Sequence, residues 1–117
     1  MLQSKIVSAY KALTKLSQQD LPIRLAFDLF KIKQLLQPQW DFQIEEETKV
    51  TAAAKQLPDG RLEFQTTEEA ETCRKKLTEI GEMEVELEIK KASIPLTAEI
   101  RLSVEDIEAL KDFVEFE

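Results

Sequence analysis

The chain has no histidine, one cysteine and two glycines among its 117 residues, and each shortage removes a class of chemistry. Without histidine there is no imidazole for general acid-base catalysis, for a serine or cysteine triad, or for an ordinary zinc site. Cys73 cannot form an internal disulfide, and free cysteines are commonly small buried hydrophobic groups. Gly60 and Gly81 are too few for a glycine-rich phosphate-binding loop. We therefore expect a protein that is not an enzyme and has no cofactor.

Long apolar runs are missing as well. No stretch of about 18 uncharged apolar residues occurs, which predicts that no helix spans a membrane. Residues 1–20 lack the basic start, apolar middle and small-residue cleavage site of a secretory signal, so we expect a cytoplasmic protein. A chain that is 43% hydrophobic and 33% charged is typical of a globular protein, and its length fits one domain over residues 1–117.

Charge is distributed unevenly along the chain. Residues 1–43 contain six basic and three acidic residues, a net charge of +3, whereas residues 44–117 contain ten basic and twenty acidic residues, a net charge of -10. Nucleic-acid binding depends on clustered cations, and the acidic part would repel phosphate. Direct binding to nucleic acid is therefore not expected.

The first 57 residues have the apolar spacing of two helices. Residues 2–18 place their apolar side chains on one arc, and polar turn residues follow up to Asp20. A second helix is expected from Pro22, and its apolar stripe continues to Leu57. Pro38 interrupts the hydrogen-bonding pattern, but the stripe keeps its phase from Leu36 to Trp40, which favours a kinked continuous helix over a break. Residues 2–57 thus predict a helical hairpin.

Residues 58–117 predict a small α+β part. The turn Pro58-Asp59-Gly60 reverses the chain, and a capping box at Thr66–Glu69 opens a helix that ends near Gly81. Residues 82–89 alternate strictly between acidic and apolar side chains, as in a strand with one face in solvent, and residues 98–102 alternate similarly. Residues 103–106 begin a last helix that continues to residue 116. The predicted fold is α+β: the long hairpin, a small antiparallel sheet, and two short C-terminal helices packed against the hairpin's base.

Two groups of residues are candidates for contact with a partner. Phe27, Leu35 and Phe42 lie outside the apolar stripe of the second helix, so they are buried only if the helix is flanked on two faces or meets a partner. A dimer that covers Leu35 and Phe42 is one such arrangement. The second group consists of Glu84, Glu86 and Glu88, which point to one side of the expected strand. The ordinary alternative for this row is the solvated face of a half-buried strand.

Several segments carry a resemblance to a known group of proteins. They are Leu21-Pro22-x-x-x-Ala26-Phe27-x-Leu29, Pro58-Asp59-Gly60, the acidic segment ending in Leu87-x-Ile89, and Leu102-Ser103-x-x-Asp106-Ile107-x-Ala109-Leu110-x-x-Phe113-Val114. Together they resemble small uncharacterised proteins encoded by tailed bacteriophages and prophages. Pro38 departs from the unbroken charged helix of that group. The resemblance implies an accessory protein in the host cytoplasm or associated with the virion, and it supplies no catalytic residues.

Three functional hypotheses follow from these observations. The first is a non-enzymatic accessory protein that binds a protein of phage or host origin, in virion assembly or on a host target. The alternative is an acidic inhibitor that imitates nucleic acid and blocks a host defence or DNA-binding protein. The third is a magnesium-dependent carboxylate enzyme, which would need three acidic residues from separate elements to converge.

Overall fold

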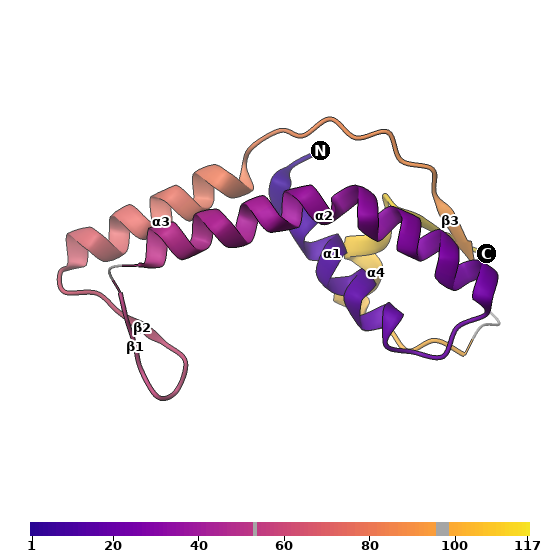
Figure 1. The fold of residues 1–117 in the computed structure, drawn as a ribbon, viewed down its shortest axis with the longest axis horizontal. Coiled ribbons are helices and arrows are strands. Elements are labelled where there is room, and N and C mark those ends of the chain that lie inside the picture. Colours follow the sequence, from indigo (N-terminus) through magenta and orange to yellow (C-terminus); the bar gives the residue numbers. More distant parts are fainter. Residues whose placement is uncertain (53, 96–98) are drawn as a thin grey trace.

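The computed structural model describes residues 1–52, 54–95 and 99–117, which form an elongated molecule of 51 × 33 × 21 Å (Figure 1). The elements in chain order are α1 (Gln3–Ser17), α2 (Ile23–Thr51), β1 (Lys55–Gln56), β2 (Leu62–Glu63), α3 (Thr67–Gly81), β3 (Ala92–Ile94), α4 (Val104–Leu110) and β4 (Val114–Phe116). Helix α2 is the longest element, and the other elements are arranged along it.

Helices α1 and α2 form the predicted hairpin, with α1 covering only the N-terminal half of α2. The side chain of Gln3, at the start of α1, donates to the Gln39 carbonyl at 2.8 Å, so the two helices run in opposite directions. Helix α2 continues through Pro38, as the phase of the apolar stripe predicted. It ends at Thr51 rather than at Leu57, because the chain turns there into the hairpin of β1 and β2.

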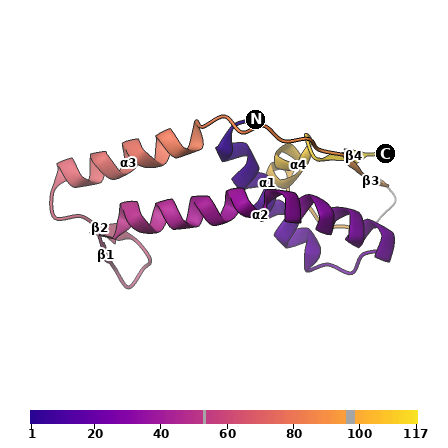
Figure 2. The same cartoon turned by 45° about the horizontal axis from the view of Figure 1, so that its top comes forward.

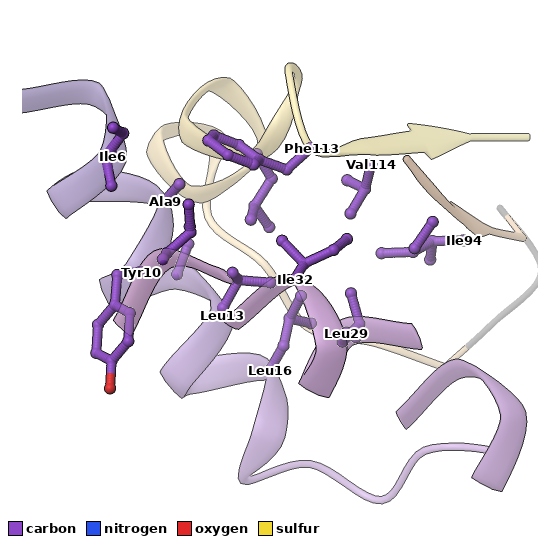
Figure 3. Packing of buried hydrophobic residues seen from close by; sticks show 14 of the residues in the cluster. Ile6, Ala9, Tyr10, Leu13, Leu16, Leu29, Ile32, Ile94, Phe113 and Val114 are labelled. Atoms are coloured by element: carbon purple, nitrogen blue, oxygen red, sulfur yellow. The ribbon is translucent and has the colours of Figure 1, made fainter. Parts of the chain in front are cut away.

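The hydrophobic core lies where α1, the N-terminal half of α2, α4 and the strands β3 and β4 meet (Figure 3). Helix α1 contributes side chains at helical spacing, and α2 faces them with its own stripe. The buried members of the cluster are Ile6, Ala9, Tyr10, Ala12, Leu13, Leu16, Leu25, Leu29, Ile32, Leu36, Ala92, Ile94, Leu110, Phe113 and Val114. Because this core involves only the first half of α2, the second half needs a different partner.

Helix α3 is that partner. It runs along the C-terminal half of α2, and α1 and α3 follow one another along α2 (Figure 2). The two helices meet where the backbone N–H of Gln3 donates to the Met83 carbonyl at 2.8 Å. The prediction that both C-terminal helices pack at the base of the hairpin is therefore wrong for α3, which lies along the projecting half of α2.

The predicted antiparallel sheet of residues 82–89 and 98–102 is not formed. Strand β3 instead pairs with β4 in a parallel sheet, with Ala92 opposite Val114 and Ile94 opposite Phe116. Parallel strands need a long crossover connection, and α4 lies in the chain between these two. The apolar positions of both strands face the core, so Ala92, Ile94 and Val114 are buried. Val114 and Phe116 thus belong to a strand, and the last helix ends earlier than predicted, at Leu110.

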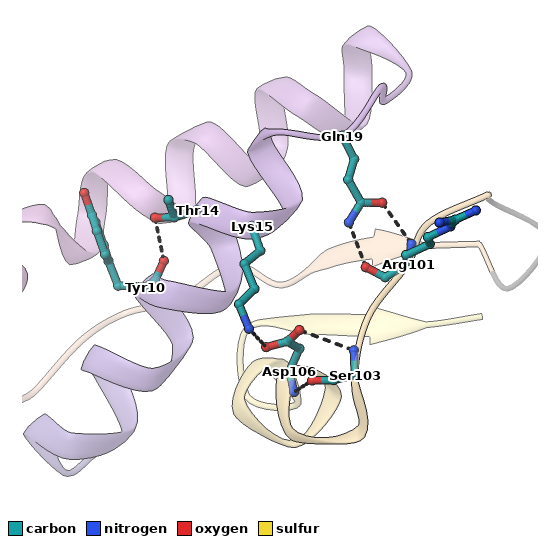
Figure 4. Close-up of polar contacts among 7 residues, drawn as sticks. All are labelled: Tyr10, Thr14, Lys15, Gln19, Arg101, Ser103 and Asp106. Atoms are coloured by element: carbon teal, nitrogen blue, oxygen red, sulfur yellow. Dashed lines mark hydrogen bonds and ion pairs between the residues drawn. The ribbon is translucent and has the colours of Figure 1, made fainter. Parts of the chain in front are cut away.

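Residues 82–91 follow α3 as a segment of extended backbone with a single bridge, between Leu2 and Glu84. The other expected strand lies partly outside the described residues, which exclude Ala98. In its described part, the backbone of Arg101 is bound by one side chain: the Gln19 amide donates to the Arg101 carbonyl at 2.7 Å and accepts from the Arg101 N–H at 2.9 Å (Figure 4). Residues 99–102 therefore bind the loop after α1 and form no strand.

The turn at Pro58-Asp59-Gly60 joins β1 to β2, which pair antiparallel over two residues each, as a hairpin turn predicts. Gly60 has φ +88°, a conformation that favours glycine. Across the described part of the chain, no helix combines the length and apolar character needed to cross a membrane.

Candidate functional site

Away from its core stripe, helix α2 carries large apolar side chains that the described chain covers only in part. One of them, Ile44, is 42% exposed and lies in the acidic half of the helix. Ile23 is 89% exposed, Phe27 54%, Phe30 51%, Leu35 40% and Phe42 36%. At 100° per residue, Ile23, Phe27 and Phe30 lie on the side of α2 opposite its buried stripe. Leu35 and Phe42 lie on the flank of the helix, about 90–110° from the stripe. We call these five residues the α2 outer face.

Packing of the core does not require the α2 outer face to be apolar. Leu25, Leu29, Ile32 and Leu36 fill the buried stripe and satisfy packing with α1. The fold therefore gains nothing from a second apolar stripe in contact with water. Contiguous exposed apolar side chains of this size are typical of a surface that binds another protein.

Charged groups flank the α2 outer face. The Lys31 ammonium lies 4.9 Å from the centre of the Phe27 ring, and Asp28 forms ion pairs with Lys31 at 3.5 Å and Arg24 at 3.8 Å. Arg24 is 89% exposed and Lys31 54%, so these pairs contribute little to stability and can exchange partners. The cations beside the rings are thus available to a binding partner.

The charge of α2 changes sign along its length. Residues 23–34 contain Arg24, Lys31 and Lys33 against Asp28, a net charge of +2. Residues 39–51 contain the acidic residues Asp41, Glu45, Glu46 and Glu47 and one cation, Lys49, a net charge of -3. A hydrogen bond from Lys49 to Glu46, together with the charges of Glu46 and Glu45, raises the pKa of Lys49 above its usual value. The acidic half therefore holds its only cation firmly protonated.

A groove of about 680 Å³ runs beside the α2 outer face, between α2 and the extended residues 88–93. Leu35 and Glu88, two of the predicted contact residues, both line it. Four cations stand around the groove, two from α2 and two from the extended segment; they are Arg24, Lys31, Lys90 and Lys91. The groove thus lies next to the α2 outer face and is lined at its edge by charged side chains.

The predicted acidic row lies on the extended segment before β3. Glu84, Glu86 and Glu88 are exposed, while the apolar residues that alternate with them are half-buried against the core. The Met1 amino group donates to the Glu84 carboxylate at 3.1 Å and to the Val85 carbonyl at 3.0 Å. The alternation correctly predicted that these three glutamates face solvent, but Met83, which it placed on the core side, is 47% exposed. Within the described residues, the segment pairs only at its start, through the bridge between Glu84 and Leu2.

The structure brings some of the predicted contact residues together and separates others. Phe27, Leu35 and Phe42 share the α2 outer face, and Glu88 lies across the groove from it. Glu84 lies at the other end of the segment, beside Met1. Ile23 and Phe30 were missing from the predicted contact set. Ile23 precedes Phe27 by four residues and Phe30 follows it by three, so helical spacing could have identified both.

The acidic clusters and the single cysteine are the remaining candidates for a functional site. Within residues 1–52, 54–95 and 99–117, no group of three or more acidic or cysteine side chains is arranged to hold a metal ion. Cys73 is buried in α3. Comparison of the chain with protein-family models, with curated proteins and with solved structures gives no significant match.

Proposed function

We propose that this chain is a non-enzymatic interaction protein and that the α2 outer face is its principal binding surface. The observation that carries the proposal is the set of five large apolar side chains that are exposed on the faces of α2 outside its core stripe. An origin in a bacteriophage or prophage, with a role in virion assembly or on a host target, remains a prediction of the resemblance.

Physical chemistry supports a binding role for this face. Aromatic side chains and arginine are enriched at the centres of protein interfaces, where they supply most of the binding energy. The α2 outer face provides Phe27, Phe30 and Phe42, with Arg24 at its margin. It is also rigid, because the other side of α2 is fixed by α1 along the same turns.

The proposal can be tested by comparing what the native chain and a face variant retain from a bacterial lysate. In the variant Phe27→Asp/Phe42→Asp, two exposed rings become charged, so proteins bound through this face should be lost. The matched control is Val104→Asp, because Val104 is 84% exposed on α4 and lies outside the α2 outer face. Retained proteins would be identified by mass spectrometry.

The expected result is at least one protein retained by the native chain and by Val104→Asp but not by the double variant. Circular dichroism should show the same helix content in all three chains. Thermal unfolding measures how much stability the double variant loses, because Phe27 is 54% and Phe42 only 36% exposed and both rings are partly buried. Identical sets of retained proteins from all three chains would contradict the proposal.

A second candidate function is an acidic inhibitor that imitates nucleic acid. The observation that favours it is the row of three exposed glutamates that alternate with half-buried apolar residues. A row of negative charges at regular spacing can occupy a cationic groove that normally binds phosphates. The residues that would carry this activity are Glu84, Glu86 and Glu88.

The dependence of binding on salt concentration distinguishes the two candidate functions. Binding through the acidic row should weaken steeply between 50 and 300 mM salt and should disappear in Glu84→Lys/Glu86→Lys/Glu88→Lys. Binding through the α2 outer face should change little in either case, because apolar contact is weakly screened. Salt-insensitive binding that survives the triple charge reversal would exclude the acidic inhibitor.

A further inference from the structure

We infer that the occupant of the α2 outer face is a second copy of this chain, with the two α2 helices packed in opposite directions. This inference rests on the proposed function, because it names the partner that the same surface takes. Three features carry it: the placement of the apolar residues, the charge reversal along α2, and the area that the face offers.

The apolar residues are placed symmetrically along the helix. Phe27 and Phe42 are equally distant from a point between Gln34 and Leu35. If two antiparallel α2 helices cross at this point, Phe27 of each copy lies opposite Phe42 of the other, and the two Leu35 side chains meet next to the two-fold axis. A two-fold interface requires such self-complementarity, since each contact must occur twice.

One oppositely charged pair follows the same symmetry, although the two acidic residues Asp28 and Asp41 are also equally distant from that point. Arg24 and Glu45 are also equally distant from the point between Gln34 and Leu35. Arg24 is 89% exposed and Glu45 is 69% exposed, so both side chains can reach a partner. The antiparallel arrangement places the +2 half of one α2 against the -3 half of the other, whereas a parallel pair would place like charges together.

The area fits a reversible dimer. An aromatic side chain has about 150–250 Å² available for burial, so Phe27 and Phe42 together with the aliphatic Ile23 and Leu35, which span about 120° of the helix, offer roughly 400 Å² of apolar surface per copy. With the stems of the flanking cations, two copies would bury about 1,200 Å², the lower limit for a specific stable interface. We therefore expect a monomer–dimer equilibrium with a Kd in the micromolar range.

Sedimentation equilibrium of the full chain from about 1 to 500 µM tests the inference directly. The native chain and Val104→Asp should shift from monomer to dimer across this range. Phe27→Asp should remain monomeric, with at least a 50-fold weaker association. A native chain that stays monomeric up to 500 µM, or a Phe27→Asp chain that dimerises like the native one, would overturn the inference.

A charge exchange tests the antiparallel arrangement. Arg24→Glu alone and Glu45→Arg alone each place like charges opposite one another in both symmetric contacts, so each should weaken dimerisation several-fold. The double variant Arg24→Glu/Glu45→Arg restores opposite charges and should recover most of the native affinity. A double variant that is weaker than either single variant would exclude the antiparallel arrangement.

Cross-linking locates the two-fold axis. In a Cys73→Ala background, Leu35→Cys should form a disulfide-linked dimer under mild oxidation, because the two thiols meet near the axis and a disulfide requires Cα atoms about 4.4–6.8 Å apart. Ser8→Cys, on the exposed side of α1, is the control and should not cross-link faster than unfolded chain. Equal rates at the two positions would contradict the proposed axis.

Failure of this inference can be distinguished from failure of the proposed function. A monomeric native chain whose lysate partner is lost in Phe27→Asp/Phe42→Asp overturns self-association and leaves the binding role of the face intact. A monomeric chain with no partner sensitive to that variant overturns both. A dimer that is lost in Phe27→Asp supports both.

Discussion

Tyr10 of α1 stacks on Trp40 of α2, with ring centres 4.6 Å apart and an angle of 13° between the planes. The Tyr10 hydroxyl also donates to the Gln37 side chain at 2.7 Å, and the Lys33 ammonium lies 5.3 Å from the Tyr10 ring. These contacts fix α1 to the turns of α2 on both sides of Pro38. They hold the two helices together where the backbone of α2 is weakest.

We predict that Trp40→Ala destabilises the protein by about 2–4 kcal/mol, because it removes a large, partly buried ring and its stacking with Tyr10. Tyr10→Phe keeps the stacked ring and loses only the hydrogen bond to Gln37, so it should cost about 1 kcal/mol. Urea unfolding followed by circular dichroism measures both. Equal costs for the two variants would show that stacking contributes little.

Pro38 offers a stabilising substitution. It has no N–H to donate to the carbonyl four residues earlier, and proline inside a helix costs about 3 kcal/mol relative to alanine. Because Pro38 is exposed and α2 is continuous around it, Pro38→Ala should remove part of this cost without losing packing. We expect a gain of about 1–3 kcal/mol in the free energy of unfolding, measured in urea. A loss of stability would mean that the fixed φ angle of Pro38 helps to place Trp40 against Tyr10.

The helices were predictable because their signals are local. Helical spacing identified α1 and the continuity of α2, and Thr66 caps α3 by accepting from the Glu69 N–H at 3.1 Å. The capping box at Ser103 is complete, because the Ser103 hydroxyl accepts from the Asp106 N–H and the Asp106 carboxylate accepts from the Ser103 N–H. The end of α2 was missed by six residues because alanines near its end continue the apolar stripe without specifying helix over turn.

The sheet was not predictable because its pairing depends on contacts far apart in the sequence. Alternation gave the correct exposed and half-buried sides for residues 84–89, though not for the exposed Met83, and it carried no information about a strand partner. The paired strands, β3 and β4, are three residues each, too short for a recognisable period. Their partnership follows from burial of Ile94 and Val114 against the core, which only the assembled helices define.

The candidate site was partly predictable for a similar reason. Phe27, Leu35 and Phe42 stood out because the core stripe of α2 left them on its other faces. The sequence did not determine whether α3 or the C-terminal part of the chain would cover these three side chains, because that depends on the tertiary arrangement. Helix α3 packs along the later half of α2 and leaves all three at least 36% exposed.

A buried amide pair supplies the next prediction. Gln3 is 1% exposed and Gln43 7%, and the Gln3 amide donates to the Gln43 side-chain oxygen at 3.4 Å. Within the described residues, the Gln3 side-chain oxygen is buried without a hydrogen-bond partner, which costs about 1–3 kcal/mol. The double variant Gln3→Leu/Gln43→Leu should therefore be as stable as the native chain or more stable. Gln43→Leu alone should be less stable than the double variant, because the Gln3 amide then loses an acceptor; unfolding in urea measures the difference.

Asp106 gives a prediction for pH dependence, because its carboxylate joins α4 to α1 (Figure 4). The carboxylate is 13% exposed, accepts from Lys15 at 3.2 Å and accepts from the Ser103 N–H at 3.3 Å. Burial tends to raise the pKa of Asp106, but the hydrogen bonds from Lys15 and Ser103 together outweigh it and hold the pKa below the ordinary value of 3.8. A carboxyl whose pKa is lower in the folded state than in the unfolded state stabilises the fold above the unfolded value, and this contribution is lost as pH falls through the folded value.

Asp106→Asn should therefore lower the melting temperature at pH 7, and the difference from the native chain should shrink as pH falls below about 3.8. Glu108→Gln is the matched control on the same helix. The Lys111 hydrogen bond lowers the pKa of Glu108 too, but this carboxylate is 72% exposed, so solvent screens the interaction. Its substitution should change the melting temperature little at any pH. If the Asp106→Asn difference stays constant from pH 7 to pH 3, the charged bond between α1 and α4 contributes no net stability, and capping by the Ser103 side chain alone determines where α4 begins.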